Sequence, residues 1–216
     1  MEYRSYTHKG TRTENEDRTL SYKFLSEIQF LGIADGMGGY EAGGEAATLA
    51  LSSILDYLKN NQKERFTKAI ILKAFEFANE QIRQFRHTNL NGAKAGATVA
   101  IALIQKNTAI CAWSGDCRIR YYKNQQLAFE SKDHTVANEW LQQGLSSNFV
   151  VSEKYQQMVT RAICGATKNW TPSFKVLKEV RVGERFLLMT DGYLEMEKDI
   201  EVTGSRDNRS FVSFYL

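Results

Sequence analysis

The chain has 216 residues, of which 43% are hydrophobic, which is enough for one compact domain with a buried core. Its 28 basic and 25 acidic residues give a formal charge of only +3 and are scattered along the chain, which argues against nucleic-acid binding. No apolar run approaches the roughly 20 residues of a membrane-spanning helix, so we expect a cytoplasmic protein with neither nucleic-acid nor membrane partners.

The first half of the chain predicts one buried strand and two amphipathic helices. The apolar run 28–34 (IQFLGIA) is rich in β-forming residues and ends abruptly at Asp35-Gly36. After a glycine-dense stretch, apolar residues recur at helical spacing in 45–59 and again from about 66 to 86. We therefore expect a strand, a glycine loop and two helices, in that order.

The second half predicts mainly strands. Consecutive β-rich runs separated by turn residues predict an antiparallel meander over 96–105, 109–113, 119–123 and 126–129. The polar stretch 136–155 predicts a helical excursion, and the alternating run 210–216 predicts the last strand. Runs 174–180 and 185–190 flank a turn and predict a hairpin. Together these elements predict an α+β fold in which helices cover the faces of a β-sandwich.

Three of the apolar strands deliver an aspartate beside a glycine at their ends: Asp35 in FLGIADG, Asp116 in AWSGD and Asp191 in FLLMTDG. One such pair is more often an ordinary turn than a ligand, and for Asp116 alone the turn is the favoured interpretation. The repetition is informative, because sheets bring distant strand ends to one edge. Carboxylates gathered there would repel one another unless a cation neutralised them.

Aspartate oxygens without histidines or thiolates are the ligands that Mg²⁺ and Mn²⁺ prefer. The carbonyl of Gly36 could join such a site, since glycine lets the backbone approach closely. Glu16 and Asp17 in RTENEDR and Asp207 in SRDNRS are further candidates, although each alone is more typical of solvated surface charge.

The cysteines do not suggest a second chemistry. Cys111, Cys117 and Cys164 are odd in number and lack CxxC spacing, which predicts buried thiols in a reducing compartment rather than disulfides or a zinc site.

Eight fragments, taken in order, span nearly the whole chain: RTENEDR, GIADGMGGYEAGGEAA, GATVAIAL, WSGDCRIR, SKDHT, TRAICG, LLMTDGYLE and RDNRSFVSF. This set resembles the metal-dependent protein phosphatases of the protein phosphatase 2C family, bacterial type. The resemblance implies one catalytic domain over residues 1–216, built as a four-layer α-β-β-α sandwich with a two-metal centre at one edge. It also implies hydrolysis of phosphoserine and phosphothreonine by a metal-bridging hydroxide.

The same resemblance implies a set of metal ligands for two Mn²⁺ or Mg²⁺ ions. Asp35 would bridge both metals and the Gly36 carbonyl would bind one of them. Asp191 and Asp207 would complete the shell of the other. A third, weaker metal would be held with the help of Asp116.

The remaining implied roles lie around these ligands. Asp17 and Glu16 would act mainly through metal-bound water. Arg12 would clamp the substrate phosphate, for which its planar fork is suited. An exposed arginine in a polar loop is the plainer interpretation of Arg12 on local sequence.

The chain departs from the family pattern in two places. Met37 stands where some members carry a histidine that can protonate the leaving group, so the general acid is unassigned. His134 has a different expected role, in structural hydrogen bonding, and His8 and His87 are expected at the surface. The short span from Asp191 to Asp207 predicts a trimmed fold with less helical cover on one sheet, and 138–157 corresponds to the variable flap of the family.

Three functions follow from these observations. The first is a phosphoprotein phosphatase that opposes a cytoplasmic serine/threonine kinase. The second is a catalytically silent relative that binds a phosphoprotein or another partner. The third keeps the chemistry but acts on a small phosphorylated metabolite.

Overall fold

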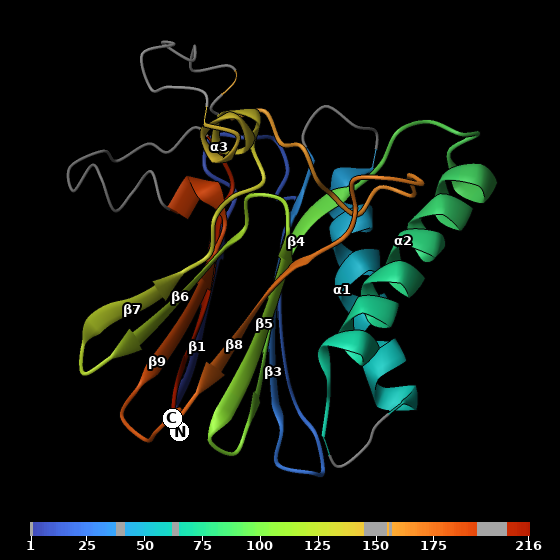
Figure 1. Ribbon diagram of the computed structural model, residues 1–216. Coiled ribbons are helices and arrows are strands. Elements are labelled where there is room, and N and C mark those ends of the chain that lie inside the picture. The colour runs from blue at the N-terminus through green and yellow to red at the C-terminus, as the bar shows by residue number, and fades with distance from the viewer. Residues whose placement is uncertain (1, 38–41, 62–64, 145–154, 156, 194–206) are drawn as a thin grey trace.

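The computed structural model describes residues 2–37, 42–61, 65–144, 155, 157–193 and 207–216. Its strands form two five-stranded antiparallel sheets that pack face to face (Figure 1). The first sheet has the order β1 (Glu2–His8), β10 (Arg209–Tyr215), β9 (Arg185–Met189), β6 (Arg118–Lys123) and β7 (Gln126–Glu130). The second has the order β2 (Asp17–Lys23), β3 (Gln29–Gly36), β4 (Ala97–Gln105), β5 (Thr108–Ser114) and β8 (Ser173–Lys178).

Two long helices, α1 (Gly43–Asn60) and α2 (Lys68–Asn89), cover the outer face of the second sheet, and the short α3 (Val136–Gln142) lies at the end of the sandwich away from the chain termini (Figure 1). Within the described ranges, no helix combines the length and apolarity needed to cross a bilayer. The predicted α+β sandwich and both predicted helices are confirmed. Among the described residues, both long helices lie on the second sheet, and the span 194–206 between Asp191 and Asp207 lies outside the described residues.

Strand β4 explains why its sequence is an unbroken apolar run. It is the central strand of the second sheet, between β3 and β5. Val99, Ile101 and Leu103 face the helices, while Ala100 and Ile104 face the first sheet. A strand buried on both faces has no solvent side on which polar residues would be favourable.

The predicted hairpin of 174–180 and 185–190 is wrong, although both strands exist. Strand β8 pairs with β5 in the second sheet, whereas β9 lies between β10 and β6 in the first. A local turn is present, with Glu184 N donating to Arg181 O at 3.3 Å. A turn alone does not decide which strands pair, and Leu177 and Phe186 enter the same core from opposite sheets.

The predicted meander is wrong at one connection. Strands β4 and β5 pair, and β6 and β7 pair, but residues 115–117 carry the chain from the second sheet to the first between these two hairpins. This connection, here called the crossing, contains Asp116. The predicted ligand therefore lies between the sheets and not in a hairpin turn.

Strands β1 and β2 and helix α3 differ from the sequence-based expectation. The polar strand β1 and the partly buried β2 were not predicted, because their residues lack an apolar alternation. The expected helical excursion 136–155 contains α3, and its stretch 145–154 falls outside the described residues.

We expect Leu103→Ala to lower the free energy of unfolding by about 2–5 kcal/mol, because the lost side chain leaves a cavity in a close-packed core. Leu103 is 0% exposed, whereas Leu25, in the turn after β2, is 95% exposed. Leu25→Ala is therefore a matched control, expected to change stability by no more than about 0.5 kcal/mol. Urea unfolding followed by circular dichroism measures both, and equal losses would contradict the core placement of Leu103.

Candidate metal centre

Four of the predicted ligands come from strand ends that meet at one end of the sandwich. Asp17 begins β2 and is the direct cross-strand partner of Asp35 near the end of β3. In the other sheet, Asp191 follows β9 and Asp207 precedes β10, and these two strands are neighbours. The Thr190 hydroxyl donates to Asp17 Oδ2 at 3.0 Å and so joins the two sheets at this end.

Asp116 approaches the same region from the crossing. Its charge interacts with that of Asp191 and contributes to the electrostatic environment of Asp35. The preceding Gly115 has φ +114°, and a Cβ there would lie 2.3 Å from Thr98 Cβ, so only glycine fits without strain. The sequence signal of an aspartate beside a glycine therefore reflects a real constraint on the backbone.

The carboxyl groups are shifted toward their protonated forms. Burial is the largest cause of the raised pKa of Asp17, to about 7, and the charges of Asp191 and Asp207 raise it further. Asp116 also has a pKa of about 7, raised by burial and then by Asp191. The pKa of Asp35 lies well above its ordinary value through burial and the charge of Asp17. Added positive charge would stabilise carboxylates held this way as anions.

The donor set suits a hard divalent cation. Asp17 Oδ1 is buried and has no hydrogen-bond partner among the described residues, which leaves a lone pair available for an ion or water. Among the residues that the structure describes, no group of three or more aspartate, glutamate, histidine or cysteine side chains is already placed to hold one ion. Mg²⁺-type sites commonly use one or two carboxylates and complete their shell with water, so the residues present fit such a group.

Gly36 lies where the backbone is crowded. Its N–H donates to Glu16 O at 3.3 Å, and a Cβ at this position would come within 2.3 Å of Gly43 O. The side chain of Glu16 lies beside the same glycines, and burial raises its pKa. Gly36 and Glu16 are therefore neighbours in space, each adjacent in sequence to one of the paired residues Asp35 and Asp17.

Arg12 also reaches the site. Its Nη2 lies 2.8 Å from Asp207 Oδ2, and this pair raises the pKa of the guanidinium, which stays charged. The side chain of Arg12 remains 52% exposed. A charged, accessible guanidinium thus lies next to the Asp207 carboxylate.

Two residues that hold the site together were missed in the sequence. Thr190 is fully buried and bonds Asp17 across the sheets. Asn208 accepts from Glu16 N at 2.8 Å and donates to Lys9 O and Glu14 O at 2.9 Å each, so it anchors the N-terminal loop. Their only sequence signal is that each directly adjoins a candidate ligand.

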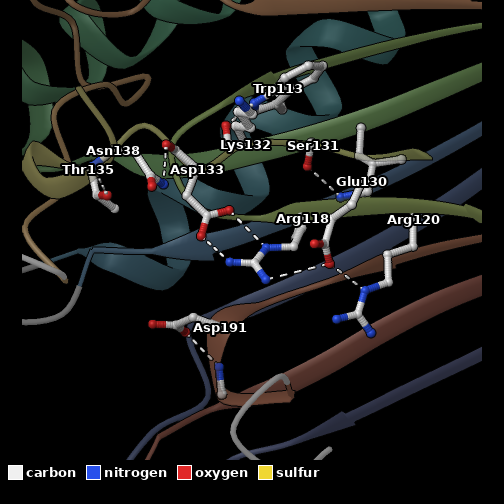
Figure 2. A network of polar contacts seen from close by, with 12 residues as sticks. Trp113, Arg118, Arg120, Glu130, Ser131, Lys132, Asp133, Thr135, Asn138 and Asp191 are labelled. Atoms are coloured by element: carbon white, nitrogen blue, oxygen red, sulfur yellow. Dashed lines mark hydrogen bonds and ion pairs between the residues drawn. The ribbon is translucent and has the colours of Figure 1, made fainter. Parts of the chain in front are cut away.

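A polar network lies next to the crossing (Figure 2). Arg118, which follows the crossing, makes a two-pronged contact with Asp133, in which Nε lies 3.0 Å from Oδ1 and Nη2 bonds Oδ2. Asn138 Nδ2 donates to the backbone oxygen of Asp133 at 3.0 Å. Arg118 also lies 3.6 Å from Glu130, which binds Arg120 at 2.6 Å. The network fixes the first residue of β6 against the segment that leads into α3.

The histidines are placed as expected. His134 is buried and hydrogen-bonded, and burial, followed by the charge of Arg161, lowers its pKa to about 4, so it is neutral at pH 7. His8 and His87 are exposed. All three cysteines are free thiols, and burial raises the pKa of Cys117, next to Asp116, well above its ordinary value.

The chain is similar to a known protein family and to proteins of named function. A family model described as "Protein phosphatase 2C" matches residues 4–215. A "Serine/threonine phosphatase stp" of Listeria welshimeri is 25% identical over 195 residues, which cover 88% of this chain and 77% of that protein. "Protein phosphatase PhpP" of Streptococcus pneumoniae is 26% identical over 200 residues, which cover 88% of this chain and 78% of that protein.

Solved structures show the same fold. The serine/threonine phosphatase of S. agalactiae superposes with a TM-score of 0.83 at 21% identity, covering 100% of this chain and 99% of that one. The catalytic domain of the phosphatase PstP in complex with two manganese ions gives a TM-score of 0.77 at 21% identity, covering 98% of this chain and 96% of that one. Because the family model covers almost the whole sequence and the architecture agrees, this chain belongs to the protein phosphatase 2C family of metal-dependent hydrolases.

Proposed function

We propose that residues 1–216 form one catalytic domain that hydrolyses phosphoserine and phosphothreonine in proteins. The observation that carries this proposal is the end of the sandwich, where buried and half-buried aspartates from both sheets adjoin a charged, accessible Arg12. Membership of the family and the phosphatase names of the relatives support the same reaction.

The proposed site binds two divalent cations, Mn²⁺ or Mg²⁺. Asp35, the Gly36 carbonyl, Asp191 and Asp207 would hold these two ions. Asp17 and Glu16 orient bound water, and Asp116 helps hold a third, weaker ion. Such a pair of cations supplies a water of lowered pKa and neutralises the charge that develops at phosphorus.

The side chains of this chain position the substrate and the ligands. Asp207 holds the Arg12 guanidinium at 2.8 Å, so that its remaining N–H groups can contact phosphate oxygens in a two-pronged manner. Thr190 fixes Asp17 by its hydrogen bond, and Asn208 fixes the loop that carries Glu16. The residues around phosphorus are thereby oriented before substrate binds, which lowers the entropic cost of the reaction.

The cellular setting is the further part of the proposal. The three free thiols support a reducing compartment, which fits the cytoplasm. A phosphatase of this class there would oppose a serine/threonine kinase that phosphorylates the same proteins.

We expect Mn²⁺-dependent hydrolysis of phosphothreonine peptides, and we expect Asp35→Asn to lower kcat/KM by at least about a hundredfold, because a bridging ligand is lost. Asp56, exposed on α1, supplies the matched control Asp56→Asn, which should keep the full rate. The fold of Asp35→Asn should persist, since neutral asparagine resembles the protonated form that burial already favours at this position.

Phosphate release from phosphothreonine peptides, sugar phosphates and an aryl phosphate separates the possible functions. Faster turnover of sugar phosphates than of peptides would favour a metabolite phosphatase. Binding of a phosphopeptide without turnover at saturating Mn²⁺ would favour a silent binding module. An unchanged rate in Asp35→Asn would show that the metal assignment is wrong.

We expect Arg12→Ala to lower kcat/KM for a phosphopeptide by roughly ten- to hundredfold, the worth of a hydrogen bond to a charged group. Arg4, exposed on β1 and paired with Glu2 at 2.7 Å, gives the matched control Arg4→Ala, which should have no effect on the rate. Both variants are assayed at saturating Mn²⁺, so that a change in metal affinity does not enter. Equal rates for the two variants would contradict the role of Arg12.

We expect Mn²⁺ binding to release protons at pH 6.5. The pKa of Asp17 and of Asp116 is about 7 without cations, and ligating carboxylates must be ionised. The apparent Mn²⁺ affinity should therefore rise from pH 6 to pH 8. Calorimetry in two buffers of different ionisation enthalpy measures the released protons, and Asp116→Asn should release fewer. A binding enthalpy that is independent of the buffer would contradict this expectation.

A further inference from the structure

His134 holds both backbone groups of Gly115. Gly115 N donates to His134 Nδ1 at 3.1 Å, and His134 N donates to Gly115 O at 2.9 Å. The proposed ligand Asp116 is the next residue in the chain, within the crossing. The buried His134 side chain therefore holds the Ser114–Gly115 peptide unit, and its backbone N–H holds the Gly115–Asp116 unit, so that both sides of Gly115 are fixed directly before Asp116.

The geometry also determines the form of the imidazole. A backbone N–H can only donate, so Nδ1 must be the acceptor and the ring proton lies on Nε2. Nε2 lies 2.8 Å from Ser173 Oγ, which accepts that proton in a hydrogen bond. The ring stacks on Trp113 with centroids 6.2 Å apart and planes 10° apart, and Trp113 Nε1 donates to Lys132 O at 2.8 Å. The orientation of the acceptor is thus fixed from three sides.

Asp133, the residue directly before His134, holds the other end of the crossing. Asp133 binds the Arg118 side chain in two contacts, one of them at 3.0 Å (Figure 2). The adjacent residues Asp133 and His134 therefore bind Arg118 and Gly115, respectively. Asp116 and Cys117 lie between these two residues in the chain. This arrangement constrains a loop that would otherwise be free to turn its carboxylate away under repulsion from Asp191.

We propose that His134 is a positioning residue whose Nδ1 lone pair orients the Gly115-Asp116 turn so that Asp116 can bind a divalent cation. This inference rests on the proposed function only in taking Asp116 as a cation ligand. His134 itself touches neither substrate nor cation, and its effect is exerted through the Gly115 backbone. Ser173 accepts the Nε2 proton but does not touch the turn, and the Gly115 N–H alone is enough to require the acceptor at Nδ1.

Two isosteric variants test the role of Nδ1. His134→Asn places an amide oxygen near the position of Nδ1, whereas His134→Gln places its amide near Nε2, facing Ser173. We expect His134→Asn to bind Mg²⁺ at Asp116 within a few-fold of the parent chain. His134→Gln and His134→Ala should need roughly tenfold more Mg²⁺, as is common when a residue behind a metal ligand is replaced. Ser173→Ala is the control and should bind like the parent.

The readout is nuclear magnetic resonance and does not require activity. Mg²⁺ titrations follow the amide shifts of Gly115 and Asp116 in each variant. In the parent chain, a scalar coupling across the hydrogen bond between Gly115 ¹⁵N and His134 ¹⁵Nδ1 should be visible. Variants that keep the fold but lose the Asp116 shifts at low Mg²⁺ support the positioning role, since a purely structural role would lower thermal stability alone.

Several outcomes would overturn the inference. These are the absence of the coupling in the parent, equal Mg²⁺ affinity in His134→Asn and His134→Gln, or no response of Asp116 to Mg²⁺ in the parent. If the parent hydrolyses no phosphopeptide but the Mg²⁺ series behaves as expected, the proposed function fails and the positioning role stands.

Discussion

The gathering of poorly solvated carboxylates at one end of the sandwich is the constraint on which the site depends. Asp17 is buried, Asp35 and Asp116 are half-buried, and Asp35 lies in the electrostatic field of both other residues. Burial is the largest cause of their raised pKa values, and the charges of neighbouring carboxylates add to it. The raised pKa values and the suitability of the site for divalent cations thus have the same cause. Uncharged groups must hold the carboxylates in place.

Those neutral groups come from outside the acidic set. Thr190 donates to Asp17, Asn208 bonds the loop before it, and His134 holds the turn before Asp116. Each uses a hydrogen bond from a buried, uncharged side chain, which adds no further electrostatic strain. The charged pairs, Arg12 with Asp207 and Arg118 with Asp133, lie farther toward solvent, where desolvation costs less.

The sequence allowed the elements to be predicted better than their pairing. Apolar periodicity indicated β4 and both long helices, because burial on defined faces leaves a local pattern. It could not indicate that β8 and β9 belong to different sheets, since pairing is decided by contacts distant in sequence. The aspartates carried a local signal in their neighbouring glycines. Thr190 and Asn208 did not, because their partners lie 173 and 192 residues away in the chain.

The crossing at residues 115–117 has a mechanical consequence. The proposed site residues are divided between the sheets. Asp17 and Asp35 belong to the second sheet, Asp191 and Asp207 adjoin the first, and Asp116 lies in the crossing. Cations bound among them would cross-link the two sheets at one end. Sliding of one sheet over the other would then break the coordination of these cations. Cation binding would then make the whole sandwich more rigid. Loss of the ions would loosen the fold and stop catalysis at the same time.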